Sequence, residues 1–256
     1  MTWKLLIMSA LLVLMLAGGS VAAPKVDSIL EQIDFIMALE SDGTAKVEIT
    51  QEIAGEGVKV YESIYYRRDA DDAFLIVMTA PEVERGNGYL RSGDNFWMYR
   101  RNTRTFQHIN RDQTIAGTNS SGEDFENSKL TDLYKPALDS SGNEIIVETV
   151  LGKTPVYRFE LTAKTDSVTY PKQIMYVRRA DYLPLKVESY ALNGTLMISA
   201  YYLNYTKVQD KYMWVKALFV DEFAPGNKSL VEIKNISLQK IDDHVFTRAY
   251  LENLSR

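Results

Sequence analysis

The sequence contains no cysteine, and its only histidines are His108 and His244. Without cysteine the chain cannot be a small scaffold held by disulfides, so an apolar core must stabilise it. The shortage of both residue types also argues against a conventional metal site built from histidine and cysteine. Asp69, Asp71 and Asp72 lack the spaced pattern of a calcium loop and are interpreted as a solvated turn. We therefore predict no metal and no cofactor.

Motifs of common catalytic sites are missing as well. The chain has no Gly-x-Ser-x-Gly elbow, no phosphate-binding loop and no His-Glu-x-x-His pair. Its carboxylates mostly occupy turns or the solvated faces of expected strands, so we predict that the protein is not an enzyme. A hydrolase of envelope polymers stays open as an alternative. The net charge of −5, without a basic stripe, argues against nucleic acid as a partner.

The first residues have the pattern of a cleavable export signal. Lys4 precedes an almost wholly apolar run at 5–17, and small residues follow as far as Ala22. This run is shorter than the roughly 20 apolar residues that span a membrane, so we favour cleavage after Ala22 over a retained anchor. We therefore predict a signal peptide at 1–22 and a single domain at 23–256, exported in soluble form to the bacterial periplasm.

The spacing of apolar residues predicts one helix followed by a long series of strands. Val26, Ile29, Ile33 and Met37 recur at helical spacing before the turn at 41–43. After this turn, apolar and polar residues alternate, which predicts short strands between turn signals. Asn193-Gly194 is a strong hairpin signal. The expected strands are 46–53, 58–67, 73–79, 88–91, 95–100, 105–110, 144–150, 156–162, 173–178, 183–191, 196–205, 212–221 and 229–236.

Three segments interrupt or end this series. Residues 114–124 are polar and predict a mobile loop, Phe125, Leu130, Leu133 and Tyr134 predict a short helix before Pro136, and 243–254 predict a helical tail. The fold class is mainly β (α+β), a long antiparallel meander with one apolar and one solvated face. Because few helices are available to cover the apolar face, the sheet must curve on itself. A curved sheet capped by helices leaves an apolar interior, which commonly holds a ligand.

Aromatic residues are abundant, with 16 Tyr, 9 Phe and 3 Trp, and they are densest at 95–99 and 201–205. Any single aromatic residue is best interpreted as part of the core, but a wide cavity would be lined by the same residue types. The residues that share one face of their strand and are predicted to line this cavity are Val47, Ile49, Phe74, Ile76, Met78, Trp97, Tyr99, Tyr157, Phe159, Leu161, Leu183, Leu185, Val187 and Ile198. The helix residues predicted to close the open side are Ile29, Ile33 and Ile36. The alternation does not tell which face of the shorter strands points inward.

Two stretches carry a family resemblance. Residues 78–81 read MTAP and are followed by GNGYLRSGDNFWMY at 86–99. Later, DYLPLKVESY occupies 181–190 and Asn-Gly occupies 193–194. In order and spacing these segments resemble the outer-membrane lipoprotein-sorting proteins of the LolA-like superfamily. The resemblance implies an incomplete antiparallel β-barrel with helices lying as a lid across its open side, a fold that shields acyl chains in the carriers of this group.

Two positions depart from the best-known carriers. Those proteins place an arginine just before the proline of the first motif, where it helps to hold the lid, and here the residue is Ala80. They tend to have a proline soon after the Trp-x-Tyr sequence, whereas Arg100 and Arg101 follow here. The arginine latch is therefore not carried over to this chain.

The leading hypothesis is a periplasmic carrier or chaperone, acting as a monomer, that shields acyl chains of lipoproteins or other lipids during transport to the outer membrane. An inner-membrane exporter and an outer-membrane acceptor are the partners that this role implies. The alternative is an envelope regulatory or interaction module that senses lipoprotein or docks a partner protein with the same fold.

Overall fold

The computed structural model describes residues 23–254 apart from 40, 111, 112, 114, 116–128 and 167. The predicted signal peptide and most of the predicted polar loop lie outside these described residues. The helices are α1 (Val26–Met37), α2 (Leu130–Leu133) and α3 (Arg248–Leu254), with short 3₁₀ helices η1 (Asp69–Asp71) and η3 (Asp243–Phe246). The strands are β1 (Gly43–Ile53), β2 (Gly57–Arg68), β3 (Ala73–Ala80), β4 (Gly88–Ser92), β5 (Asn95–Arg100), β6 (Thr105–His108), β7 (Tyr134–Pro136), β8 (Ile146–Leu151), β9 (Thr154–Ala163), β10 (Lys172–Arg178), β11 (Pro184–Tyr190), β12 (Leu196–Val208), β13 (Lys211–Asp221) and β14 (Lys228–Ser237).

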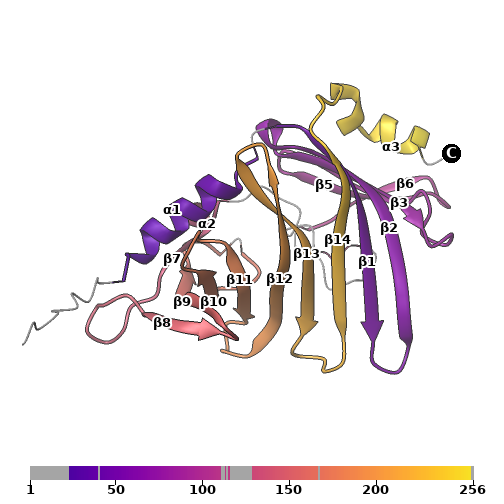
Figure 1. The fold of residues 1–256 in the computed structure, drawn as a ribbon. Helices are drawn as coiled ribbons and strands as arrows, with labels where there is room; N and C mark the ends of the chain where they lie inside the picture. Colours follow the sequence, from indigo (N-terminus) through magenta and orange to yellow (C-terminus); the bar gives the residue numbers. More distant parts are fainter. Residues whose placement is uncertain are drawn as a thin grey trace, which may run out of the picture.

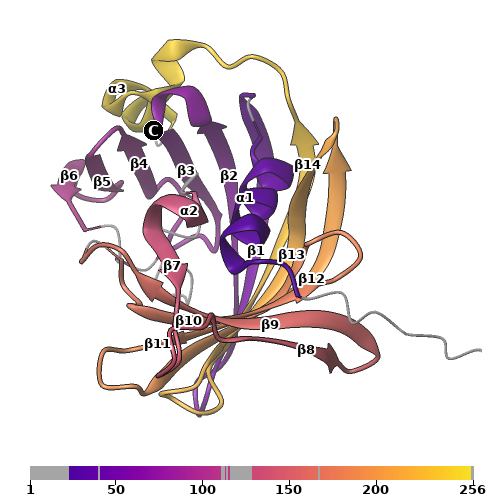
Figure 2. The same cartoon turned by 90° about the vertical axis from the view of Figure 1, so that its left-hand side faces the viewer.

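The strands form one antiparallel sheet of 14 strands (Figure 1). Its order is β6-β5-β4-β3-β2-β1-β14-β13-β12-β11-β10-β9-β7, and β8 pairs with β9 next to β7. Within the described residues the two ends of this order do not pair, so the sheet curves strongly without closing into a barrel (Figure 2). The predicted fold class, mainly β with an incomplete antiparallel barrel, is confirmed.

Local sequence signals account for most of the elements. The predicted helix is α1, and its apolar residues Val26, Ile29, Leu30 and Ile33 are all buried. The predicted Asn193-Gly194 turn joins β11 to β12, with Gly194 at a φ of 83° that glycine adopts easily. The predicted tail is helical too, as η3 and α3.

The short strand β7 was not predicted as a strand. Its first residue, Tyr134, lies in the segment predicted as a helix, and that helix is the single turn α2. Tyr134 pairs with Ala163 and Pro136 with Leu161 on β9. This pairing joins segments far apart in the sequence, so a local pattern cannot reveal it. The proline is tolerated because β7 is an edge strand.

The helices lie on opposite faces of the sheet. Figure 2 shows α1 and α2 inside the curve, whereas α3 lies over the ends of β3, β4 and β5 on the other side. Strand β3 is buried on both faces, since Phe74, Ile76 and Met78 point inward and Leu75 and Val77 pack beneath η3 and α3. None of the described helices combines the length and apolar character needed to cross a bilayer.

A buried arginine joins the C-terminal segment to the sheet. The Arg68 guanidinium donates to both carboxylate oxygens of Asp42, at 3.1 and 3.0 Å, to Asp243 at 2.7 Å, and to the carbonyl of Ile241. It also lies 4.8 Å from the ring centroid of Phe246. The hydrogen bonds from Arg68 hold the pKa of Asp42 below its ordinary value. Arg68 thereby fixes η3, and the α3 helix that follows it, to the outside of the sheet.

Candidate functional site

Two apolar clusters share one face of the sheet, which we call the interior face. The central cluster spans β1–β5 and β12–β14 and consists of Val47, Ile49, Tyr61, Tyr65, Phe74, Ile76, Met78, Tyr89, Phe96, Ile109, Ile115, Ala200, Ala217, Phe219 and Val231. The helix cluster joins α1 to β7 and β9–β11 and consists of Val26, Ile29, Leu30, Ile33, Tyr134, Tyr157, Phe159, Leu161, Met175, Val177 and Val187.

These two clusters are continuous. Val187 of the helix cluster lies directly opposite Ala200 of the central cluster in the β11–β12 pairing, so both side chains share a face. Tyr202 packs against both clusters. The interior face is therefore one apolar surface that extends across most of the curved sheet.

Most of the predicted lining residues lie on this interior face. Those that belong to the central cluster or pack against it are Val47, Ile49, Phe74, Ile76, Met78 and Ile198. Those in the helix cluster are Tyr157, Phe159, Leu161 and Val187. Leu183 is buried and Leu185 half-buried, and both line an open pocket at the edge of this face. The structure thus brings these residues together, and their contact with a lipid stays a prediction.

Trp97 and Tyr99 do not share this surface. Both pack with the third apolar cluster, on the opposite face of the sheet, beneath η3 and α3. Their neighbours Phe96 and Met98 point to the interior face instead. Alternation along β5 separated the two sets of side chains but did not indicate which set faces inward.

A sequence signal for this second apolar layer was present. Residues 73–78 of β3 are apolar at every position, and such a run is typical of a strand covered on both faces. The helical tail supplies the cover through Val245, Phe246 and Leu251. Together the two patterns indicate that the aromatic residues of β5 divide between two apolar layers.

Helix α1 lies across the interior face, in the position predicted for a lid (Figure 2). Ile29 and Ile33 are buried in the helix cluster, while Ile36 near the end of the helix is half-buried. At the start of the helix, the Val26 N–H donates to Glu144 Oε2 at 2.8 Å. This carboxylate satisfies one of the N–H groups that a helix leaves unpaired at its first turn.

Asp34 links α1 to α2. Its carboxylate accepts hydrogen bonds from the N–H of Leu130 at 2.8 Å, the N–H of Thr131 at 3.0 Å and the Thr131 hydroxyl at 2.7 Å. A carboxylate that receives the first N–H groups of a helix acts as its N-cap. The two helices therefore form one unit over the helix cluster.

Lys211 holds the other end of α1. Its ammonium donates to the carbonyl of Phe35 at 2.7 Å and lies 3.7 Å from the centroid of the Phe35 ring. A cation is favourable at this end because the last carbonyls of a helix carry partial negative charge. Lys211 begins β13, so this contact ties the helix to the β12–β13 hairpin.

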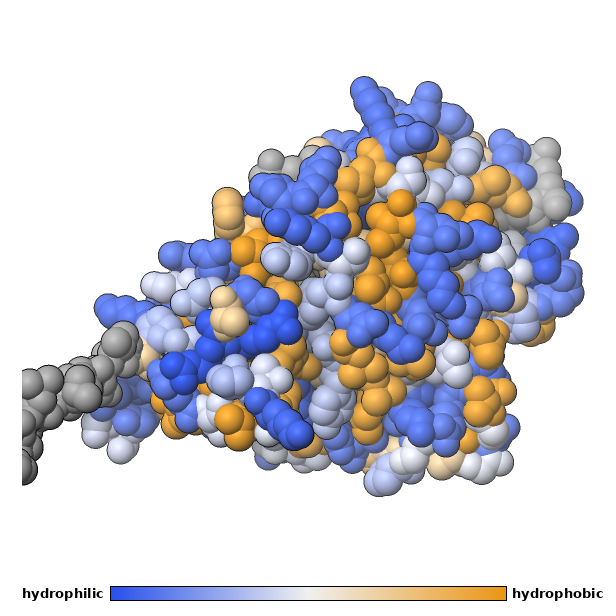
Figure 3. All heavy atoms as spheres, in the orientation of Figure 1, coloured by the Kyte–Doolittle hydropathy of each residue, from blue (hydrophilic) through white to orange (hydrophobic). Residues whose placement is uncertain are grey.

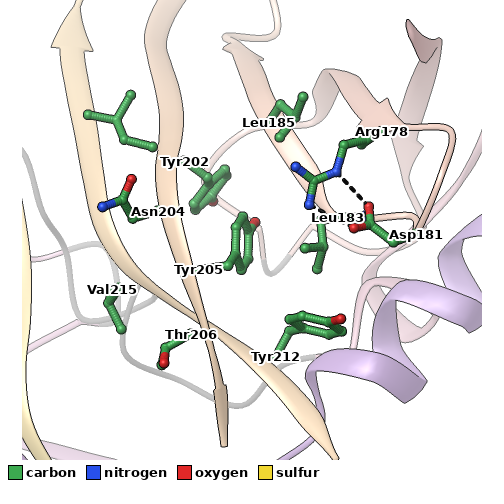
Figure 4. Close-up of a pocket in the computed structure, with 11 residues that line it drawn as sticks. Arg178, Asp181, Leu183, Leu185, Tyr202, Asn204, Tyr205, Thr206, Tyr212 and Val215 are labelled. Atoms are coloured by element: carbon green, nitrogen blue, oxygen red, sulfur yellow. Dashed lines mark hydrogen bonds and ion pairs between the residues drawn. The ribbon is translucent and has the colours of Figure 1, made fainter. Parts of the chain in front are cut away.

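An open pocket of about 500 Å³ lies where α1 meets the β12–β13 hairpin (Figure 4). The residues that line it are Arg178, Asp181, Leu183, Leu185, Tyr202, Leu203, Asn204, Tyr205, Thr206, Tyr212 and Val215. Figure 4 shows the Tyr202, Tyr205 and Tyr212 rings on one side and the Arg178–Asp181 pair facing them. Only Leu183 and Leu185 in this set were predicted site residues, although 201–205 was recognised as densely aromatic.

The charged groups of the pocket are paired with each other. Arg178 Nε and Nη2 donate to the two carboxylate oxygens of Asp181, each at 2.7 Å. The Tyr205 hydroxyl donates to the carbonyl of Pro184 at 2.7 Å. Burial raises the pKa of Tyr205 well above its ordinary value, so the phenol stays protonated. The pocket therefore carries no net charge at neutral pH.

The outer surface differs from the interior. In Figure 3 hydrophobic side chains form strips and spots between hydrophilic ones. Large exposed apolar side chains such as Leu192 and Phe223 lie singly at hairpin turns, and single exposed apolar side chains are normal on a protein surface. Among the described residues, no group of three or more histidines, cysteines and carboxylates is arranged to hold a metal ion.

Comparison with known proteins identifies the fold and a family. A family model with the description "Uncharacterized protein" matches residues 70–253. The chain belongs to this family. A search among curated proteins finds no match. The fold is LolA-like, since three solved structures match it along nearly their whole lengths.

A LolA superfamily protein from Nitrosomonas europaea is 21% identical, with a TM-score of 0.74, and the match covers 89% of this chain and 100% of that one. A putative outer membrane lipoprotein-sorting protein domain from Vibrio parahaemolyticus is 17% identical, with a TM-score of 0.75, covering 88% and 97%. A DUF1329 family protein from Desulfovibrio piger is 18% identical, also with a TM-score of 0.75 and coverage of 88% and 97%. The LolA-like resemblance predicted from the sequence motifs is confirmed.

Proposed function

We propose that this protein is a periplasmic carrier that shields acyl chains of lipoproteins or other lipids on their way to the outer membrane. The observation that carries the proposal is the continuous apolar interior face, whose helix cluster is covered by the separate helix α1. The LolA-like fold supports it, because one protein with this fold is described as a putative outer membrane lipoprotein-sorting protein domain. The role needs no catalytic step, and we propose it as a non-enzymatic one.

The affinity would come from apolar burial. Each methylene group removed from water contributes about 0.8 kcal/mol, so ten buried methylenes contribute about 8 kcal/mol. That free energy corresponds to roughly micromolar affinity before the cost of immobilising the ligand is subtracted. An acyl chain that enters the helix cluster has to displace Ile29 and Ile33, so α1 is the element that moves in this proposal.

Transport in the periplasm requires partners and a route. We propose that an inner-membrane exporter hands the lipid to the carrier and that an outer-membrane acceptor removes it. The carrier would act as an exported, soluble monomer. Each of these steps is part of the proposal, and all of them require that the protein binds lipid.

Lipid binding is tested with the purified mature chain. We expect lipid to co-purify, as detected by mass spectrometry, and a fluorescent fatty acid to bind with saturation. Ile36→Glu places a carboxylate at the half-buried edge of α1 and should weaken fatty acid binding. Ser28→Glu adds the same charge at an exposed position of the helix and is the matched control. Absence of both co-purified lipid and saturable binding would refute the carrier function.

Strand β8 favours a second candidate, an interaction module that docks a partner protein. Its outer edge is not paired within the described residues, and Val147 and Val150 are exposed. The strand has the sequence IVETVL, with one charge and no proline, so it lacks the features that usually protect sheet edges. An extended partner segment can add to such an edge as a further strand.

The lack of cysteine makes this candidate testable. Thr149→Cys would place the only thiol of the chain on β8, and Thr195→Cys would place it at an exposed turn of the sheet. A crosslinked partner obtained in intact cells from Thr149→Cys alone supports docking at this edge. Equal products from both positions, or none from Thr149→Cys, would exclude it.

A further inference from the structure

The pocket beside α1 arises from irregular pairing between β12 and β13. Tyr202 pairs with Ala217 and Tyr205 with Trp214, and the register shifts on both sides of Asn204. Such bulges redirect side chains and are frequent next to binding sites. Here they place the rings of Tyr202 and Tyr205 side by side, with centroids 6.3 Å apart, on the side that faces Arg178 (Figure 4).

This pocket adjoins the apolar interior. Tyr202 lines the pocket and also packs against both interior clusters. Leu183 and Leu185 extend the apolar lining toward Val187, which is a member of the helix cluster on the same strand segment. A molecule bound on the interior face can therefore reach the pocket with one end.

The free polar groups of the pocket are uncharged. Arg178 is neutralised by its two hydrogen bonds to Asp181, and the Tyr205 hydroxyl is bound to a backbone carbonyl. Within the described residues, neither the Asn204 amide nor the Thr206 hydroxyl is engaged by another group. These two side chains offer hydrogen-bond donors and acceptors without a charge.

We propose that the pocket binds the uncharged head group of an amphiphile, bearing hydroxyl or amide groups, whose acyl chain lies on the interior face. This inference rests on the proposed carrier function and assigns the head group to a separate subsite. The volume of about 500 Å³ lies within the range of small-molecule sites, and an aromatic lining with a few polar groups is typical of them.

A charged head group fits this pocket less well. A phosphate or sulfate would need an unpaired cation to compensate its desolvation. Arg178 supplies one only if it leaves Asp181, which would then lose both of its charge-assisted hydrogen bonds. A hydroxyl or amide can bind to Asn204 and Thr206 while that ion pair stays intact.

The test is displacement of a fluorescent fatty acid by amphiphiles that share one dodecyl chain. The competitors are dodecyl maltoside, monododecanoyl glycerol, dodecylphosphocholine and dodecyl sulfate, each below its critical micelle concentration. We expect the two amphiphiles with uncharged head groups to compete about tenfold more strongly than the charged ones. This ratio corresponds to the free energy of at least one buried hydrogen bond that a charged head group would not form. The relative affinity for dodecyl maltoside and monododecanoyl glycerol then indicates whether the natural ligand carries a sugar or a glycerol head group.

Two pocket variants and one control complete the experiment. Asn204→Ala and Tyr212→Ala should each reduce the affinity for the preferred uncharged competitor about threefold to tenfold. Tyr201→Ala is the matched control, because this tyrosine does not line the pocket and its ring lies 5.1 Å from the Lys186 ammonium instead. Asn204 is exposed, so its replacement leaves the packed core intact even if Tyr212→Ala does not fold.

The outcomes separate the inference from the carrier function. Head-group preference that is lost in Asn204→Ala and kept in Tyr201→Ala supports the subsite. If the fatty acid binds but all four competitors are equal, or Asn204→Ala keeps the preference, the subsite is refuted and the carrier function stands. If the fatty acid does not bind, both are refuted.

Discussion

Replacing Asp34 by alanine tests how α1 is held over the interior face. The change removes three hydrogen bonds to α2, at 2.8, 3.0 and 2.7 Å, and leaves the sheet contacts of α1 in place. Loss of a single N-cap costs about 1 kcal/mol, and hydrogen bonds to a charged group are stronger than neutral ones. Because Asp34 is partly solvated in the folded state, we expect a loss of about 2 kcal/mol of local stability. This value corresponds to a roughly 30-fold larger open population of α1 and α2.

Hydrogen exchange followed by mass spectrometry measures this opening. We expect faster exchange of the amides of α1 and α2 in Asp34→Ala, with unchanged protection of β1, β2 and β14. Glu31→Ala, at an exposed position of the same helix, controls for the change in charge and helix propensity. Unchanged exchange in α1, or an equal increase across the whole sheet, would show that Asp34 does not stabilise α1 and α2 locally.

Two further predictions concern the outer face. Hydrogen bonds from Arg68 lower the pKa of Asp42, so this pair stabilises the fold above the unfolded pKa near 4 and its contribution is lost as the pH falls further. Urea unfolding from pH 6 to pH 2.5 should therefore show a steeper acid loss in the wild type than in Asp42→Asn, and parallel curves would refute the linkage. A Cβ at Gly88 would lie 2.5 Å from Leu251 Cδ1 and 2.8 Å from a backbone oxygen, so Gly88→Ala should destabilise the fold by about 1–3 kcal/mol in thermal unfolding. Gly43→Ala has its nearest contact at 4.0 Å and should be nearly neutral, so equal losses in both variants would contradict the packing explanation.

The elements that the sequence predicted are those with a strong local signal. The spacing of Ile29, Leu30 and Ile33 determines which side of α1 is apolar, whatever it packs against. The Asn193-Gly194 turn fixes the β11–β12 hairpin through backbone conformation alone. These features depend on neighbours in the chain, so a single sequence is enough to identify them.

What the sequence did not predict depends on contacts between distant segments. Strand β7 exists because Tyr134 pairs with Ala163, and the direction in which Trp97 points depends on the position of α3. The pocket depends on register shifts around Asn204, which follow from how β12 and β13 fit their neighbours. The aromatic density at 201–205 marked the region, but it did not indicate the register shift between Tyr202 and Asn204.

The two halves of the sheet are stabilised in different ways, and this difference bears on where a ligand enters. Strands β3–β5 are covered by apolar side chains on both faces, with α3 fixed outside through the Arg68 contacts. Among the described residues, the apolar cluster on strands β9–β11 lies on the interior face, while their outer face carries polar and charged groups such as Glu160, Lys186 and Glu188. Displacing α1 therefore exposes one layer and leaves the β3–β5 half intact, so an opening at the helix cluster has a local cost rather than that of unfolding the sheet.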